Sequence, residues 1–290
     1  MNQNAAPIVS FHRGEQSFTL GTESDAEVLH LHGSTGLGLA PIAHSLSDRI
    51  GASGSLHRGV RYEARELFLP LLIYKDSYAE ATAVRRQLYR FLAPHLGPVE
   101  IRIEDPATGT CRGIFGYLKG GLDGDFGGDF HGNWQKIGLT FICPDPWWLG
   151  EPRMISLKVN PGIKPFLSET APFFPVTLAQ STLKGEYTID VQGDGPVFPV
   201  WEVTGAGQDL TLTSGKGETF RVLHTLKEGE SYTIDTEKKL LTPDLWDKVP
   251  LDSHMFALAP GLNRLSVSMV GATERATVTA IYRERFMEAI

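Results

Sequence analysis

Two glycine-rich stretches are the first places in this sequence where chemistry could occur. Residues 33–38 read GSTGLG, but no Lys-Ser or Lys-Thr follows and the GxGxxG spacing of a phosphate-binding loop is absent. Residues 51–55 read GASGS, but they lack the GxSxG spacing of a nucleophile elbow and its strand–turn–helix context. Both stretches favour flexible loops, and neither predicts a nucleotide site or an activated serine.

Histidines, cysteines and carboxylates occur without a recognisable ligand set. His30 and His32 would share one face of a strand, but no HExxH motif or carboxylate-rich neighbour completes a metal site, so we expect surface or partly buried histidines. The two cysteines, Cys111 and Cys143, are expected to be buried free thiols. No carboxylate pair is singled out for glycoside hydrolysis. The sequence predicts no catalytic residue, no metal and no cofactor, and therefore no enzyme.

A segment rich in glycine and aspartate, residues 119–133, has part of a calcium-loop pattern. Asp123, Asp125 and Asp129 occupy positions 1, 3 and 7, but position 12 is Trp134 instead of glutamate. The segment instead favours a solvated hairpin tip, or an arm that contacts a partner and becomes ordered on assembly. The assembly-contact candidates are Gly121, Asp123, Asp125, Phe126, Asp129 and Phe130.

Length and composition are those of a globular protein with two domains. The chain has 290 residues, 41% of them hydrophobic and 21% charged, with a mean hydropathy of −0.12. No apolar run approaches the roughly 20 residues that cross a bilayer, and the N-terminus lacks the pattern of a secretory signal. We therefore expect synthesis in the cytoplasm and no membrane insertion.

The charge is acidic and is shared by the two halves of the chain. The net charge is −7, with 13 basic and 16 acidic side chains in residues 1–148 and 14 and 18 in residues 149–290. Neither half has the basic balance that binds a phosphate backbone. Specific nucleic-acid binding is disfavoured.

The first half should be a sheet with one long helix. A capping box at residues 77–80 (SYAE) precedes apolar residues at steps of three and four, and Pro94 ends the pattern, so a helix is predicted over about 77–93. Residues 99–103 and 134–143 are strand-like. These elements predict an N-terminal β-sandwich with one helix and a long hairpin or loop.

The second half should be all β. Short alternating runs separated by glycine and proline turns predict an antiparallel β-sandwich or jelly roll. The runs are residues 187–191, 197–203, 210–213, 219–223, 232–235, 265–269 and 276–282. Trp201, Trp246 and Tyr232 could stack on a sugar, although the alternation around Trp201 favours a core position.

The stretch ICPDPWWLG, residues 142–150, lies where the two halves meet. Pro144 and Pro146 restrict the backbone, and Trp147 and Trp148 offer large apolar surfaces that could wedge against both domains. We therefore expect a stiffened junction between a domain of residues 1–148 and a domain of residues 149–290.

The ordered set of these features resembles the siphophage distal tail protein family. The similar pieces are the helix ending in LYRFL (88–92), the corner FICPDPWW (141–148) and, in the second half, WEVTG (201–205), GETF (217–220), TIDT (233–236) and LAPGLN (258–263). The resemblance spans essentially the whole chain. Signature residues of galectin-type sugar binding and an inserted receptor-binding module are not evident in it.

The resemblance implies a fold and a function. It implies a C-terminal domain with a galectin-like or carbohydrate-module-like fold, and a homo-oligomeric ring, usually a hexamer, made by the N-terminal domains. In that family the ring is a minor tail protein or baseplate hub at the distal end of the virion's tail. It connects the tail tube and tape measure to the tail-tip and adhesion proteins, and DNA passes through its lumen without specific binding. The alternatives are a carbohydrate-binding host-adhesion module and a glycoside- or peptidoglycan-cleaving enzyme.

Overall fold

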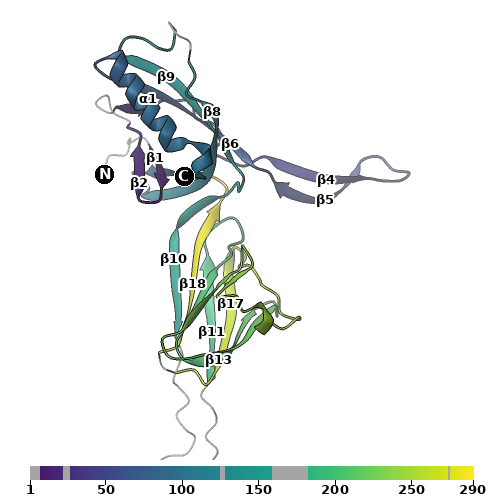
Figure 1. Cartoon of the computed structure of the whole chain (residues 1–290). Coiled ribbons are helices and arrows are strands. Elements are labelled where there is room, and N and C mark those ends of the chain that lie inside the picture. The colour runs from purple at the N-terminus through teal and green to yellow at the C-terminus, as the bar shows by residue number, and fades with distance from the viewer. Residues whose placement is uncertain (1–6, 22–26, 125–127, 159–181, 274) are drawn as a thin grey trace, which may run out of the picture. The chain divides into compact units, whose positions relative to one another are not determined.

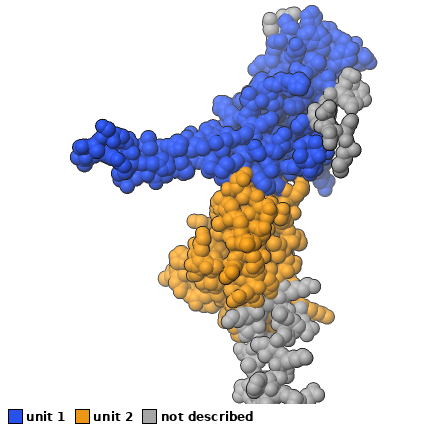
Figure 2. All heavy atoms as spheres, turned by 180° about the vertical axis from the view of Figure 1, so that it is seen from behind, with its two compact units in different colours: residues 1–150, 286–290 blue, residues 151–285 orange. Residues whose placement is uncertain are grey.

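The computed structural model describes residues 7–21, 27–124, 128–158, 182–273 and 275–290 (Figure 1). The chain divides into two compact units, shown in two colours in Figure 2. Unit 1 comprises residues 1–150 together with residues 286–290, and unit 2 comprises residues 151–285. The sequence interpretation had placed the last five residues in the second domain, whereas the structure returns them to the first.

Unit 1 is built from strands that surround one apolar core. The strand order β2-β1-β7-β8 continues as β8-β9-β6-β3, because the long strand β8 pairs with β7 along its first part and with β9 along its second. The bounds are β1 Ile8–Arg13, β2 Gln16–Thr19, β3 Val28–His30, β6 Arg65–Tyr74, β7 Val99–Asp105, β8 Thr110–Gly121 and β9 Trp134–Cys143. The two parts face each other across the core, where the rings of Phe11 and Phe141 lie 5.6 Å apart.

Helix α1, Tyr78–Leu92, lies over β6 and β9. The Ser77 hydroxyl caps it by accepting a hydrogen bond from the Glu80 backbone N–H at 3.3 Å, as the capping pattern predicted. The helix buries Ala81, Val84, Leu88 and Leu92 in the core of unit 1. Phe91 is partly exposed and packs beside the core. A short 3₁₀ helix, η1 Pro94–Leu96, follows where proline stops the α-helix.

Two further strands of unit 1 form an arm that the sequence interpretation did not contain. β4 Ile42–Asp48 and β5 Ser55–Tyr62 pair with each other in a separate two-stranded sheet. We call residues 42–62 the β4–β5 arm; it extends away from the rest of unit 1 (Figures 1 and 2). The GASGS stretch, which the sequence favoured as a flexible loop, is the turn of this hairpin, with positive φ at Gly51 and Gly54.

Unit 2 is a sandwich of two antiparallel sheets. One sheet has the order β16-β15-β12-β18-β10 and the other the order β11-β17-β13-β14, and the apolar core lies between them. The bounds are β10 Trp148–Lys158, β11 Thr182–Val191, β12 Val200–Thr204, β13 Gly207–Ser214, β14 Thr219–Leu226, β15 Ser231–Asp235, β16 Leu240–Thr242, β17 Gly261–Val270 and β18 Thr277–Phe286, with a 3₁₀ helix η2 at Trp246–Lys248. The prediction of a mainly β protein with one long helix is confirmed.

Candidate assembly surfaces

The β4–β5 arm is a largely exposed pair of strands in unit 1. In the described part of the chain no third strand pairs with it, so both of its outer edges present free backbone groups. Its side chains include exposed apolar groups: Leu46 is 60% and Val60 55% exposed, and Ile50 lies at the tip. An isolated two-stranded ribbon is marginally stable in water, and exposed apolar surface of this kind marks an interaction site. Apolar and polar residues alternate along the sequence on both sides of GASG, and this pattern could have predicted a hairpin there.

A second exposed apolar surface of unit 1 lies on the outer face of β6 and β8. Residues alternate along these strands, so that Leu67 and Leu69 point into the core while Phe68, Phe115 and Tyr117 point outward. Phe115 is 42% exposed, and the ring of Phe68 lies against Gly138 of the intervening strand. We call Phe68, Phe115 and Tyr117 the aromatic face.

The expected junction residues pack within unit 1. Trp148 is fully buried in its core, and Trp147 makes an edge-on contact with Tyr62, with ring centroids 5.0 Å apart. Pro144 is exposed and Pro146 partly exposed, and the Trp147 backbone N–H donates to the Asp145 carboxylate at 3.4 Å. The two indoles therefore anchor the start of β10 in unit 1. Their role as a stiff junction stays a proposal.

Arg65 is a buried centre of hydrogen bonds beside this corner. Its Nη1 donates to the backbone carbonyls of Gly36 and Gly38 at 2.8 and 2.6 Å, and its guanidinium lies over the Trp148 ring at 5.6 Å. A Cβ on Gly36 would lie 2.0 Å from the Glu66 carbonyl oxygen, and φ there is +84°, so this position requires glycine. The GSTGLG stretch thus packs closely against β6, and its backbone carbonyls accept hydrogen bonds from the buried Arg65.

The C-terminal segment, residues 286–290, is held by two arginines. Arg65 Nη2 donates to the Met287 carbonyl and Arg112 Nη1 to the Glu288 carbonyl, both at 2.9 Å. The Arg112 guanidinium lies 3.8 Å from the centroid of the Phe286 ring. The Ala289 N–H donates to the Leu37 carbonyl at 2.9 Å. The last residues therefore complete the fold of unit 1.

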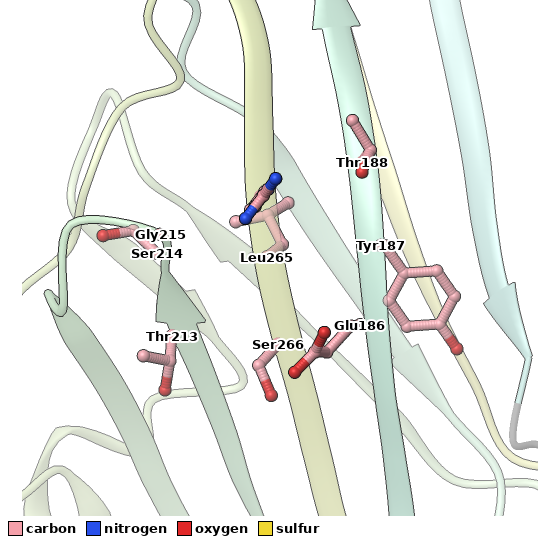
Figure 3. Close-up of a pocket in the computed structure, with 9 residues that line it drawn as sticks. Glu186, Tyr187, Thr188, Thr213, Ser214, Gly215, Leu265 and Ser266 are labelled. Carbon is pink, nitrogen blue, oxygen red and sulfur yellow. The ribbon is translucent and has the colours of Figure 1, made fainter.

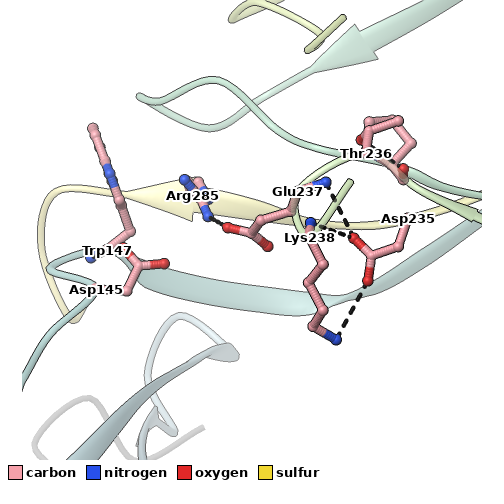
Figure 4. Close-up of polar contacts among 8 residues, drawn as sticks. Asp145, Trp147, Asp235, Thr236, Glu237, Lys238 and Arg285 are labelled. Atoms are coloured by element: carbon pink, nitrogen blue, oxygen red, sulfur yellow. Dashed lines mark hydrogen bonds and ion pairs between the residues drawn. The ribbon is translucent and has the colours of Figure 1, made fainter. Parts of the chain in front are cut away.

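The end of unit 2 that precedes this segment is also fixed. Arg285 forms an ion pair with Glu237 (Figure 4). Its guanidinium also lies over the Phe198 ring, 4.9 Å from the ring centroid. Asp235 closes the adjoining turn by accepting from the backbone N–H groups of Glu237 and Lys238 at 3.1 and 2.9 Å. These contacts set where β18 leaves unit 2.

The glycine-aspartate segment lies between β8 and β9, and the structure describes its residues 119–124 and 128–133. Gly121 is needed there because its φ is +111° and a Cβ would lie 1.8 Å from the Gly138 carbonyl oxygen. Asp123 is exposed and Asp129 half-buried. Phe130 is buried in the core of unit 1, with the Arg85 guanidinium 4.5 Å above its ring, so it is not available as an assembly contact. Asp125 and Phe126 lie outside the described residues.

Unit 2 has a groove of about 420 Å³ on the outer face of its β11-β17-β13 sheet (Figure 3). It is lined by Glu186, Arg264 and the hydroxyl side chains of Thr188, Thr213 and Ser266. The Tyr187 ring points away from Glu186 and packs partly against the core. Two aromatic candidates for sugar stacking are excluded by burial, since Trp201 is 1% and Tyr232 2% exposed; Trp246 is exposed but does not line this groove.

The titratable groups of the sequence interpretation occupy ordinary structural positions. Cys143 is buried as expected, and burial raises its pKa to about 12, whereas Cys111 is half-buried. His30 is partly buried, which lowers its pKa, and it shares a 2.6 Å hydrogen bond with the Ser34 hydroxyl. In the described part of the chain, no three His, Cys, Asp or Glu side chains come together as a metal site, and no helix is long and apolar enough to cross a membrane.

Comparisons with known proteins identify what this chain is similar to. Residues 192–286 match the family of siphovirus-type tail components, C-terminal domain. The crystal structure of the SPP1 Dit (gp 19.1) protein, described as a paradigm of the hub adsorption apparatus in Gram-positive-infecting phages, superposes with a TM-score of 0.62 at 15% identity, covering 89% of this chain and 93% of that one. A chain of the phage P2 baseplate in its activated conformation with Ca superposes with a TM-score of 0.56 at 9% identity, covering 96% and 98%. At such low identities, these superpositions show a shared fold. A comparison with curated proteins finds no match.

Proposed function

Because residues 192–286 carry the C-terminal domain of the siphovirus-type tail component family, which confirms the resemblance seen in the sequence, we propose that this chain is a structural subunit of the hub at the distal end of a bacteriophage tail. In this proposal unit 1 of several copies, six in a hexamer, forms a ring. The ring joins the tail tube and tape measure to the tip and adhesion proteins, and the chain performs no catalysis.

The observation that carries the proposal is the β4–β5 arm. A closed ring requires two different, complementary patches on each subunit. The arm supplies one patch, since Leu46 and Val60 are exposed on a ribbon that has no third strand among the described residues. The aromatic face supplies the other, with three exposed aromatic side chains on the same unit. The arm of one subunit would cover the aromatic face of the next.

The lumen of such a ring should let DNA pass without holding it. Residues 1–148 carry 13 basic and 16 acidic side chains, an excess of negative charge that disfavours binding of the phosphate backbone. The acidic balance is therefore compatible with passage. The partners implied by the proposal are proteins, and its location is the virion.

The experiment measures the mass of the purified full-length chain by light scattering, with images of the particles by negative-stain microscopy. The wild type should form rings of several 31.8 kDa chains. The arm variant Leu46→Ser/Val60→Ser and the face variant Phe115→Ser/Tyr117→Ser should both be folded and mainly monomeric. The matched control Leu223→Ser, an exposed leucine of unit 2, should still form rings.

Mixing the two defective variants tests the direction of the interface. The arm variant keeps an intact aromatic face and the face variant an intact arm, so each mixed pair has one complete interface. Equimolar mixing should therefore produce heterodimers and no rings. A wild type that stays monomeric at all concentrations, or arm and face variants that assemble like the wild type, would contradict the proposal.

A further inference from the structure

The β4–β5 arm carries two histidines in direct contact. His44 on β4 and His57 on β5 are both exposed, and Nδ1 of His44 lies 3.2 Å from Nε2 of His57. Their ring centroids are 5.4 Å apart with an interplanar angle of 58°. Neither residue is needed for the packing of unit 1, because both side chains project from a ribbon that has no core of its own.

The strand register places this pair on one face of the arm. His44 is opposite Val60 and Leu46 is opposite His57, and a bulge leaves Arg58 out of the pairing. Opposite residues of an antiparallel pair share a face, so the two imidazoles are flanked by two exposed apolar side chains. Two arginines of β5 follow His57: Arg58 Nε donates to the Ser47 hydroxyl at 2.9 Å, and Arg61 forms an ion pair with Glu63 at 3.0 Å.

The spacing of the two ring nitrogens is that of two ligands on one metal ion. Zinc–nitrogen bonds of about 2.0–2.1 Å at tetrahedral angles place two nitrogen ligands about 3.3 Å apart. The observed 3.2 Å separation is therefore close to the metal-bound geometry before any movement of the strands. Imidazole is the ligand that Zn²⁺, Cu²⁺ and Ni²⁺ share, whereas Ca²⁺ and Mg²⁺ prefer oxygen.

We propose that His44 and His57 form a two-histidine site for a divalent transition-metal cation, with Zn²⁺ as the representative ion. In the free protein one ring donates its N–H to the other. On binding, that proton moves through solvent to the other nitrogen of the same ring. Both facing nitrogens then offer lone pairs to the metal, and both imidazoles remain neutral. Water fills the remaining positions, because the described residues supply no third ligand there.

Binding has a mechanical consequence for the arm. A metal held by both strands cross-links the hairpin at its middle, and it stabilises the folded ribbon relative to open forms by mass action. Leu46 and Val60 limit the access of water on either side of the ion. The proposal concerns the isolated chain and does not depend on ring formation.

The test is a calorimetric titration of the full-length protein with Zn²⁺ at pH 7.5. The wild type should bind one ion per chain, and His44→Gln and His57→Gln should each weaken that binding at least tenfold. His95→Gln removes another exposed histidine of unit 1 and should leave the affinity within twofold.

Hydrogen exchange gives a second readout, which does not rely on the heat of binding that calorimetry measures. Zn²⁺ should slow exchange of the backbone amides of residues 42–48 and 55–62 in the wild type and not in the His44→Gln/His57→Gln protein. Light scattering on the same samples measures the mass of the particles, and so shows whether slower exchange accompanies a change in oligomeric state. Equal Zn²⁺ affinity in the wild type and the double variant, or no Zn²⁺ binding by the wild type, would overturn the proposal.

Discussion

At the scale of single residues, Arg65 is the side chain on which the most distant parts of unit 1 depend. It is 1% exposed and donates to backbone carbonyls in the segment of residues 36–38 and in the C-terminal segment. Burial lowers its pKa, but the guanidinium stays protonated because it is an extremely weak acid. Carbonyl dipoles and the Trp148 ring take the place of the water that the cation has lost.

Replacing this arginine should expose how much those bonds contribute. Arg65→Met keeps much of the aliphatic volume but leaves the backbone carbonyls of Gly36, Gly38 and Met287 without this donor, and we expect a loss of about 3–5 kcal/mol in the free energy of unfolding. Arg61→Met, which breaks an exposed ion pair four residues away, should cost less than about 1 kcal/mol. Urea titration measures both, and similar losses for the two variants would contradict this role of Arg65.

At the scale of elements, helix and arm differ in what stabilises them. Helix α1 has a capped N-terminus and a buried apolar face, so that local sequence and packing agree. The arm has a hairpin turn and exposed apolar side chains but no packed face among the described residues. The helix should therefore be a stable part of the isolated subunit, and the arm the part that gains stability from a partner or a bound ion.

The cap of α1 can be tested by itself. Ser77→Ala removes the acceptor of the Glu80 N–H and should lower the free energy of unfolding by about 1 kcal/mol. Ser77→Asp keeps a side-chain oxygen at the cap and adds a negative charge at the helix N-terminus, so it should be within about 0.5 kcal/mol of the wild type. Equilibrium denaturation that ranks the aspartate variant with the alanine variant would show that the hydrogen bond is unimportant.

At the scale of the whole molecule, unit 1 is discontinuous in sequence. The chain leaves it along β10, builds unit 2, and returns along β18 to place residues 286–290 against Arg65, Arg112 and Leu37. An N-terminal domain cut after residue 150 therefore lacks part of its own structure. Unit 2 is in this sense an insertion between two pieces of unit 1.

Truncation of the full chain tests this organisation. Deleting residues 286–290 removes the Phe286 ring from Arg112 and one acceptor from Arg65, and it should lower the unfolding midpoint of unit 1 by several degrees, at about 2–4 °C per kcal/mol. Deleting Ile290 alone keeps the contacts of Phe286, Met287, Glu288 and Ala289, and it should shift the midpoint by less than about 1 °C. Scanning calorimetry that finds equal midpoints for the two truncations would contradict the discontinuous domain.

Elements with local signals could be predicted from the sequence. The helix begins one residue after its predicted cap, β9 has the predicted bounds, and the expected core position of Trp201 is confirmed. The assembly-contact candidates were less well placed, since Phe130 is buried and Asp125 and Phe126 lie outside the described residues. The β4–β5 arm was not predicted, although its GASGS turn was expected to be a loop. The sequence of a glycine-rich segment does not show whether an aromatic residue within it is exposed or, like Phe130, is buried beneath an arginine from another element.

The sequence by itself determined the mainly β class and the single capped helix, because side-chain periodicity, caps and turn residues act over a few neighbouring positions. Its quoted motifs also carry the resemblance to distal tail proteins. The tertiary structure alone decided that GSTGLG faces Arg65 and that the C-terminus belongs to unit 1. It also decided that His44 meets His57. These pairings join residues 13 to more than 200 positions apart, and they follow from strand register and chain return, which no local pattern specifies.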